Sequence, residues 1–354
     1  MLNSAVRREL AIRTNQAVGT PFAHCEMEVV ESKGFSNTII YRFSNGTGAY
    51  AIRSWPSQAA SRDKIGFWIA CNLEFEQECA PFPKLHRWVQ HDTGSDTVLR
   101  LGDQFWTLAD WVQGHPLKLQ DTGLETLEHL GAVLGAIHMN TQRMSERELK
   151  GIQIVKSSPT ILERLAFLDG LTYDVLRVVP SDHFYDTRGI KDKVVGSLTK
   201  LLEKKGEWQR FLGACAKRLR NCHWIVRDLW YENVLVDSNS RFVSIVDLGA
   251  ARIDWPGLDF VRLFDSVIGN APRLAGGSGQ EWWGKALAAY SNVHPTHSID
   301  SLDECMLLGE ITTSLSIAQW VQWIAESRFP MQNQDMCERI ASRLAELCSR
   351  FAPD

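Results

Sequence analysis

The first third of the chain has the two-residue period of β-strands. Apolar and β-branched side chains alternate with polar ones in residues 36–43 and again in residues 50–55, and the segment Asn-Gly-Thr-Gly at 45–48 separates the two runs. Two such runs around a turn rich in glycine and asparagine predict a β-hairpin. Residues 97–101 and 104–112 return to the same period, so the sequence predicts a small antiparallel sheet.

Apolar side chains at spacings of three and four predict helices in the rest of the chain. The first such stretch is residues 61–75, and beyond Gly114 this period dominates. The later helical stretches cover residues 124–137, 191–219, 282–290, 302–325 and 336–351. One strand-like passage interrupts them, from residue 224 to residue 246. We therefore predict an α+β protein with a small β-rich lobe and hinge at residues 1–113 and a larger, mainly helical lobe at residues 114–354.

Composition excludes several classes of protein. The 354 residues suggest two domains. The chain has 38 basic and 42 acidic residues and a net charge of -4. It therefore lacks the basic surplus that is typical of nucleic-acid-binding proteins. No run approaches the roughly 18 to 20 apolar residues of a membrane helix, and no signal peptide is recognisable. Eight cysteines without a C-x-x-C pair indicate reduced thiols, so a cytoplasmic protein is expected.

The segment from His223 to Ala250 contains the candidate chemistry. Asp228 and Asn233 are five residues apart, Asn233 leads into one apolar run, and a second apolar run ends at Asp247. In phosphoryl transfer, one carboxylate orients or deprotonates the attacking hydroxyl, while an amide oxygen and a second carboxylate hold Mg²⁺ on the nucleotide phosphates. The alternative interpretation is an ordinary β-hairpin with turn-forming Asp and Asn residues.

This segment resembles the catalytic and metal-binding loops of the aminoglycoside phosphotransferase family, small-molecule kinases that share the protein-kinase fold. The matching positions are Asp228, Asn233-Val234-Leu235 and Val246-Asp247-Leu248-Gly249. Residues 34–43 resemble the loop that covers the nucleotide and its following strand, and residues 104–114 resemble the strand and hinge that meet the adenine. The resemblance spans about residues 30 to 270 and implies a bilobal kinase-like fold.

The resemblance also implies roles for the matched residues. Asp228 would be the catalytic residue that positions and deprotonates the substrate hydroxyl, and Asn233 and Asp247 would hold Mg²⁺. The phosphates would be bound by Arg53, Gly34, Ser36 and Asn37. The chain departs from the family pattern at two of these places: Val226-Arg227 precedes the catalytic Asp where the family has His-Gly, and Arg53 stands where a phosphate-pairing Lys is usual. Arg can pair phosphates through its planar fork.

Four further residues near the motif have open roles. For Arg227, Trp230 and Asp259, both substrate contact and a structural role fit the pattern. Trp230, inside the catalytic loop, is the expected substrate contact, whereas a buried Asp259 could accept hydrogen bonds from backbone N–H groups of that loop. Asp254 could lie near the substrate or be a solvated loop acid, and we expect the solvated position.

The leading hypothesis is a Mg²⁺-dependent phosphotransferase that moves the γ-phosphate of ATP or GTP to a hydroxyl of a small molecule. The alternative is a catalytically degraded kinase-like protein that binds nucleotide or has a regulatory role. Its expected partners are the nucleotide and the small-molecule substrate, with no nucleic acid and no membrane. A polycationic substrate would favour an acidic cleft, to which several acids of the helical lobe could contribute: Asp254, Glu281, Asp300, Asp303 and Glu304.

Overall fold

The structure is a computed structural model of the chain. It describes residues 4–19, 26–30, 39–46, 48–55, 82–90, 94–148, 154–181, 183–271, 278–295, 299, 301–328 and 334–349. The chain forms two compact units, Met1–Leu117 with Glu232–Ala251 and Lys118–Tyr231 with Arg252–Asp354. We call them unit 1 and unit 2 and describe each by itself.

The main sheet of unit 1 is antiparallel, as its alternating sequence predicts. Its strands run in the order β1-β2-β3-β8-β4, and β7 also pairs with β8. Their bounds are β1 Glu26–Val30, β2 Ile40–Asn45, β3 Gly48–Trp55, β4 Leu85–His86, β7 Leu99–Leu101 and β8 Gln104–Asp110. The β2–β3 hairpin pairs Ile40 with Arg53 and Asn45 with Gly48, which confirms the predicted hairpin and its turn.

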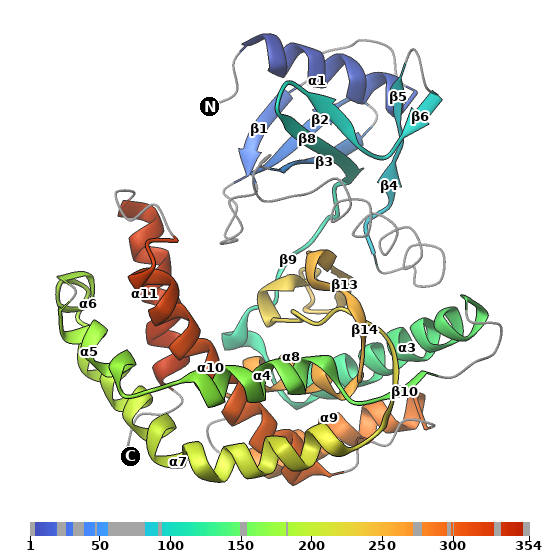
Figure 1. The fold of residues 1–354 in the computed structure, drawn as a ribbon. Helices are drawn as coiled ribbons and strands as arrows, with labels where there is room; N and C mark the ends of the chain where they lie inside the picture. The colour runs from blue at the N-terminus through green and yellow to red at the C-terminus, as the bar shows by residue number, and fades with distance from the viewer. Residues whose placement is uncertain are drawn as a thin grey trace. The chain divides into compact units, whose positions relative to one another are not determined.

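One face of this sheet forms the core of unit 1. Phe43, Ile52, Trp106 and Leu108 are fully buried there, and Leu10 of helix α1 (Ser4–Ala17) packs into the same cluster. Figure 1 shows α1 lying along the sheet. A separate ladder joins β5 (Trp88–Gln90) to β6 (Gly94–Asp96). Ile52 and Ser54 of β3 are buried on this face of the sheet. Because successive side chains of a strand point to opposite faces, Arg53 between them lies on the other face.

Unit 1 also includes a second small sheet from far along the chain. Its order is β13-β12-β9, with β9 His115–Pro116, β12 Val234–Val236 and β13 Phe242–Ile245. Because β12 pairs with β9, residues 232–251 group with the N-terminal unit and not with the predicted C-terminal lobe at residues 114–354.

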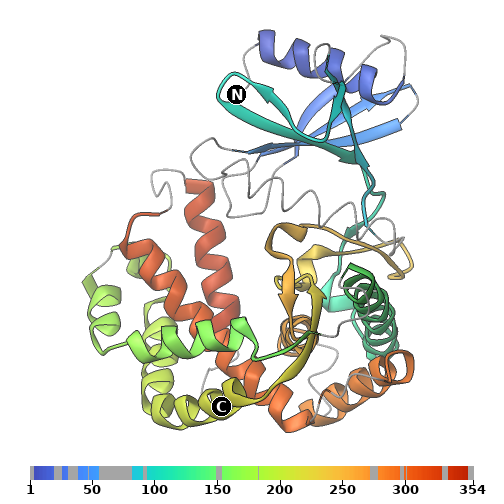
Figure 2. The same cartoon turned by 45° about the vertical axis from the view of Figure 1, so that its right-hand side comes forward.

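Unit 2 is mainly helical. Its helices are α3 Leu124–Glu148, α4 Pro159–Gly170, α5 Asp174–Ser181, α6 His183–Thr187, α7 Lys191–Lys217, α8 Gly257–Ile268, α9 Gly279–Val293, α10 Leu302–Ala325 and α11 Gln334–Ser349. Figure 2 shows α10 and α11 in orange and red beside the green helices of the same unit. A three-stranded sheet in the order β10-β11-β14 lies among them, with β10 Ile154–Lys156, β11 Arg220–Ile225 and β14 Arg252–Asp254.

Helices α3 and α9 make the closest packing in unit 2. Gly131 and Gly135, one turn apart on α3, lie against the backbone of α9: a Cβ on Gly131 would come within 2.5 Å of the Ala286 carbonyl oxygen, and one on Gly135 within 2.8 Å of that of Tyr290. Only residues without a side chain allow this approach. Helix α3 also packs against β11, the strand that leads toward Asp228.

The predicted fold class is confirmed, with an antiparallel N-terminal sheet followed by a mainly helical region. Each predicted helix from residue 124 onward is present, with longer bounds at α3 and α9. The predicted helix at 61–75 lies outside the described residues. In the part of the chain that the structure describes, no helix is both long enough and apolar enough to span a membrane.

Candidate active site

The β12–β13 hairpin brings two of the predicted metal ligands to one end. Val234 pairs with Ile245 in the antiparallel register, and the Val246 N–H donates to the Asn233 carbonyl at 2.9 Å. Asn233 therefore lies opposite Val246, the residue before Asp247. The ladder fixes the separation of Asn233 and Asp247, which is the arrangement that their spacing in the sequence predicted.

Arg53 meets Asp247 within unit 1. Its Nη1 lies 3.1 Å from Asp247 Oδ1, and its guanidinium lies over the Trp55 ring at 4.5 Å. The side chain of Arg53 is mostly buried, whereas that of Asp247 is 42% exposed. The residue expected to pair the phosphates and one expected to hold the metal thus already touch, and the exposed face of Asp247 has carboxylate oxygen available to a cation.

Asp228 lies three residues after the end of β11 in unit 2. Its side chain is 56% exposed, and its Oδ1 lies 3.3 Å from Nη2 of Arg262 on α8. Arg227, just before it, has φ = 70°, in the left-handed region that non-glycine residues rarely adopt. Asp247 has φ = 64°. Backbone strain of this kind concentrates at functional sites, and here it occurs beside or at both candidate carboxylates.

Asp259 braces the segment that leads into Asp228. It is completely buried, and its carboxylate accepts the N–H of Val226 at 2.7 Å and that of Arg227 at 2.6 Å. His138, also buried, places its Nε2 3.2 Å from Asp259. Burial raises the pKa of Asp259 to about 7, although the two backbone N–H groups act to lower it. Of the two open roles for Asp259, this geometry matches the structural one.

Trp230 is 3% exposed. Arg262 and Arg343 lie over its ring at 4.3 Å and 4.4 Å, so arginines cover the indole. Substrate contact by Trp230 stays a prediction. The visible effect of Trp230 is to hold Arg262, the partner of Asp228, in place through cation–π contacts.

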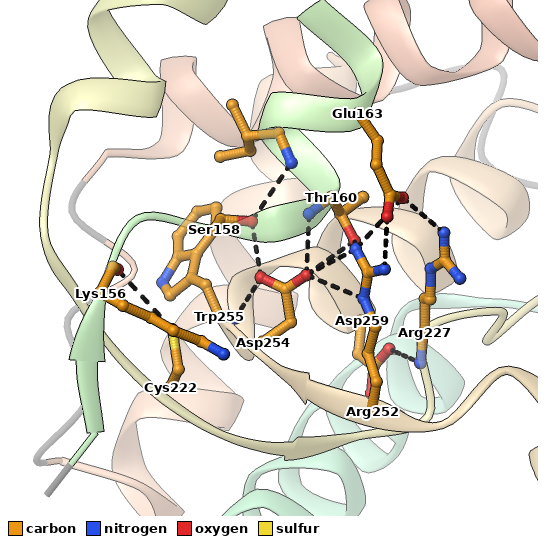
Figure 3. A network of polar contacts seen from close by, with 11 residues as sticks. Lys156, Ser158, Thr160, Glu163, Cys222, Arg227, Arg252, Asp254, Trp255 and Asp259 are labelled. Atoms are coloured by element: carbon orange, nitrogen blue, oxygen red, sulfur yellow. Dashed lines mark hydrogen bonds and ion pairs between the residues drawn. The ribbon is translucent and has the colours of Figure 1, made fainter. Parts of the chain in front are cut away.

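The prediction that Asp254 is solvated is wrong. Asp254 is fully buried at the end of β14, and both carboxylate oxygens accept hydrogen bonds from the start of α4 (Figure 3). Ser158 Oγ donates to Oδ1 at 2.6 Å, and the N–H and Oγ1 of Thr160 donate to Oδ2 at 2.9 and 2.7 Å. Arg252 also pairs with it at 3.0 Å. These partners satisfy the buried charge, which would otherwise be costly.

This network was missed by sequence reasoning, and it reaches the candidate catalytic loop. Glu163 of α4 pairs with Arg252 at 2.7 Å and with Arg227 at 2.7 Å (Figure 3). Burial acts to raise the pKa of Glu163, but the bond from Arg252 and the charges of both arginines outweigh it and the pKa is lowered. The Ser-Pro sequence before α4 was the available signal, since Ser158 caps that helix through Ile161 N–H.

The residue types at the end of the β12–β13 hairpin fit the binding of Mg²⁺ on a nucleotide. Mg²⁺ is bound through oxygen atoms, and water and substrate phosphates usually complete its shell. The side-chain amide of Asn233 and the exposed carboxylate of Asp247, at the same end of the hairpin, have oxygen atoms of this kind. Among the residues that the structure describes, no cluster of three or more His, Cys, Asp or Glu side chains forms a protein-only metal cage. Gly34, Ser36 and Asn37 lie outside the described residues.

The family model described as "Phosphotransferase enzyme family" matches residues 30–293. No curated protein matches the chain by sequence.

Solved structures of small-molecule kinases share the fold. An aminoglycoside phosphotransferase from Alicyclobacillus acidocaldarius is 12% identical, with 95% of this chain and 93% of that chain covered and a TM-score of 0.54. A spectinomycin phosphotransferase in complex with ADP and spectinomycin is 12% identical, with coverages of 96% and 93% and a TM-score of 0.58. An amicoumacin kinase in complex with AMP-PNP and Ca²⁺ is also 12% identical, with coverages of 97% and 96% and a TM-score of 0.57. The predicted kinase-like fold is thereby confirmed.

Proposed function

The chain belongs to the phosphotransferase enzyme family, and from that premise we propose that it transfers the γ-phosphate of ATP to a hydroxyl group of a small molecule in a Mg²⁺-dependent reaction. The observation that carries the proposal is the hairpin end at which Asn233 and Asp247 are held together and Arg53 pairs with Asp247. The ADP and AMP-PNP in two of the similar structures favour ATP over GTP as the donor.

Each residue has a defined task in this reaction. Asp228 accepts the proton of the substrate hydroxyl as its oxygen bonds to the γ-phosphorus, and the bond from that phosphorus to the β–γ bridging oxygen breaks to release ADP. Asn233 and Asp247 would hold Mg²⁺, which supplies charge neutralisation at the phosphates. Arg53, mostly buried over Trp55, binds phosphate oxygens from a fixed position.

The hydrogen bonds around Asp228 prepare it for this role. Asp259 accepts the two N–H groups just before Asp228 and so fixes the backbone of the loop. Arg262 pairs with the carboxylate at 3.3 Å and helps to orient it. A positioned carboxylate of this kind contributes catalysis by orientation as well as by proton transfer.

The test separates the two aspartates. Asp228→Asn should lower kcat by about two to four orders of magnitude, the span of a general base, and leave Mg²⁺–ATP affinity nearly unchanged. Asp247→Asn removes a charged metal ligand, so Mg²⁺-dependent ATP affinity and turnover should both fall. Nucleotide titration with and without Mg²⁺, alongside ATP consumption with a mixed pool of hydroxyl compounds, measures both effects. Asp103→Asn, on an exposed turn of unit 1, is the matched control.

Three outcomes would contradict the proposal. If Asp228→Asn loses ATP binding while Asp247→Asn keeps it, the two roles are reversed. If neither variant differs from Asp103→Asn, the assigned chemistry is wrong. If the parent protein binds Mg²⁺–ATP but transfers phosphate to no acceptor, the alternative of a nucleotide-binding protein without turnover replaces the kinase.

A further inference from the structure

The backbone just before Asp228 makes a tight turn. The Asp228 N–H donates to the Val226 carbonyl at 3.0 Å, which closes a three-residue γ-turn with Arg227 at its centre. Arg227 has φ = 70°, and a γ-turn with a positive φ at its central residue is rare and strained. Glycine would adopt this conformation without the steric cost that a side chain brings. The turn therefore persists only because other contacts of Arg227 offset that cost.

Two carboxylates make these contacts with Arg227. Asp259 of α8 accepts the Arg227 N–H at 2.6 Å and so holds its backbone. Glu163 of α4 binds the far end of the same residue, with its Oε2 2.7 Å from Nη2 of Arg227 (Figure 3). Arg227 is thus held both at its backbone and at the tip of its side chain, and the second contact uses the side chain that glycine lacks.

Glu163 is itself held by a second arginine. Its Oε1 lies 2.7 Å from Nη1 of Arg252, and its Oε2 lies 3.2 Å from Nη2 of the same residue (Figure 3). Arg252 also pairs with the buried Asp254, which accepts the Thr160 N–H at the start of α4. A carboxylate bound by a guanidinium through two bonds has a fixed orientation. The buried network around Asp254 therefore determines where the Glu163 oxygen that binds Arg227 lies.

The exposure of the Arg227–Glu163 pair limits what it can contribute to stability. The two side chains are 38% and 52% exposed. Ion pairs with this exposure contribute little to the stability of a fold, because water already solvates both charges. A small displacement of a reacting group, in contrast, lowers a reaction rate strongly. The pair should therefore affect the position of Asp228 more than it affects the unfolding of unit 2.

We propose that Glu163 is a positioning residue for phosphate transfer, because its ion pair with Arg227 holds the γ-turn that directs the Asp228 carboxylate to the substrate hydroxyl. Glu163 acts through Arg227 and contacts neither the nucleotide nor the acceptor. This inference rests on the proposed function, since Asp228 is the proton acceptor of that reaction.

The first test measures the order of the γ-turn without turnover. Amide hydrogen exchange of the full-length protein is followed by mass spectrometry in peptides that contain residues 226–231. Glu163→Gln removes the charge that binds Arg227 and keeps the size of the side chain, so these amides should exchange about two- to fivefold faster. Glu338→Gln is the matched control, because Glu338 of α11 is 53% exposed and pairs with Arg188 at 3.4 Å. It should leave the exchange of these peptides unchanged.

The second test measures turnover with the compound of the mixed hydroxyl pool that the parent phosphorylates fastest. Glu163→Gln should lower kcat about 5- to 50-fold, because the proton acceptor is displaced. The KM for ATP should change less than twofold, since Glu163 does not contact the nucleotide. The thermal unfolding midpoint should stay close to that of Glu338→Gln. A residue that only stabilises the fold would lower this midpoint and leave kcat unchanged at temperatures well below it.

A double-mutant cycle tests whether Glu163 acts through Arg227. Arg227→Met removes the guanidinium and should lower kcat about as much as Glu163→Gln does. When both changes are combined, the further loss should be less than twofold, because the contact is already absent. Arg227→Lys keeps a charge that can pair with Glu163 and should have a higher kcat than Arg227→Met. This advantage of the lysine should disappear when Glu163→Gln is added.

The outcomes separate this inference from the proposed function. Equal kcat in Glu163→Gln and Glu338→Gln, or losses that multiply in the cycle, overturn the positioning role and leave the kinase standing. A lower unfolding midpoint with unchanged kcat gives Glu163 a structural role and also overturns the inference. A parent that phosphorylates no acceptor overturns the proposed reaction. Hydrogen exchange then decides the remaining part: faster exchange at residues 226–231 in Glu163→Gln alone supports its hold on the turn, and unchanged exchange refutes it.

Discussion

Replacing Asp254 by Asn tests whether the buried network of unit 2 has the energetic role that its geometry implies. The two shapes are the same, and the change is confined to one oxygen that becomes an NH₂ group. In the parent, Oδ1 accepts the Trp255 N–H at 2.8 Å and Oδ2 accepts the Thr160 N–H at 2.9 Å. The Asn side chain has only one acceptor oxygen. One of these two backbone N–H groups would therefore face the new NH₂ group, which is itself a donor.

The expected loss is worked out from these contacts. The hydroxyls of Ser158 and Thr160 can rotate to accept from the new NH₂ group, so they lose little. A buried backbone N–H left without an acceptor costs about 1–3 kcal/mol. Arg252 also loses a charged partner at 3.0 Å but keeps Glu163 at 2.7 Å, so this part is smaller. We expect Asp254→Asn to lower the free energy of unfolding by about 2–4 kcal/mol.

Urea unfolding followed by far-ultraviolet circular dichroism measures this loss, because most of the helical residues that the structure describes belong to unit 2. Asp174→Asn, the same substitution at an exposed acid of α5, is the control and should change the midpoint very little. The phosphotransfer rate at low urea should fall as well, since Glu163 links this network to Arg227. A loss below 1 kcal/mol for Asp254→Asn would refute the view that Asp254 is a buried, fully used acceptor.

Three further predictions concern one residue each. Arg53→Ala should weaken Mg²⁺–ATP affinity about tenfold or more by calorimetry while Arg53→Lys keeps most of it; unchanged affinity in the Ala variant would refute a phosphate contact. Asp259→Asn should lower the unfolding free energy by about 1–3 kcal/mol, because each carboxylate oxygen accepts a backbone N–H. Since burial raises the pKa of Asp259 to about 7, the folded state keeps a proton that the unfolded state releases above its ordinary pKa of about 4. Asp259 should therefore make the free energy of unfolding of the parent fall as the pH rises from about 4 to 7. Urea unfolding at several pH values should show this fall in the parent and not in Asp259→Asn. Gly131→Ala should destabilise unit 2 by about 1–3 kcal/mol in the same assay, because its Cβ would meet the Ala286 carbonyl oxygen at 2.5 Å, and an unchanged midpoint would contradict this packing.

The features that the sequence predicted well depend on local rules. The β2–β3 hairpin follows from alternation around a short turn, and its register matches that turn. The pairing of Asn233 opposite Val246 follows in the same way from two apolar runs joined by a tight turn. The helices after residue 124 follow from the three-and-four spacing of apolar positions. In each case the contacting residues are close in the chain, so the local sequence pattern is enough to predict their contact.

The burial of Asp254 could not be predicted because its partners are distant in the chain. Ser158 lies 96 residues away and Thr160 lies 94 residues away, in a segment without a recognisable motif. An aspartate beside a turn is usually exposed, and only the arrival of the α4 N-terminus changes that. The same applies to Arg164 of α4, because the charged groups that act on it come from the loop after β11, from β14 and from α8.

The left-handed backbone at Arg227 and at Asp247 is accompanied in each case by a contact inside the same unit. A left-handed conformation costs roughly 1–2 kcal/mol for a residue with a side chain, so it persists only where local contacts offset it. At Arg227 the offset is the N–H donated to Asp259 at 2.6 Å, and both residues belong to unit 2. At Asp247 it is the ion pair with Arg53 at 3.1 Å, and both residues belong to unit 1. The backbone before the candidate proton acceptor Asp228 and the backbone of the candidate metal ligand Asp247 are therefore each fixed by contacts inside a single unit.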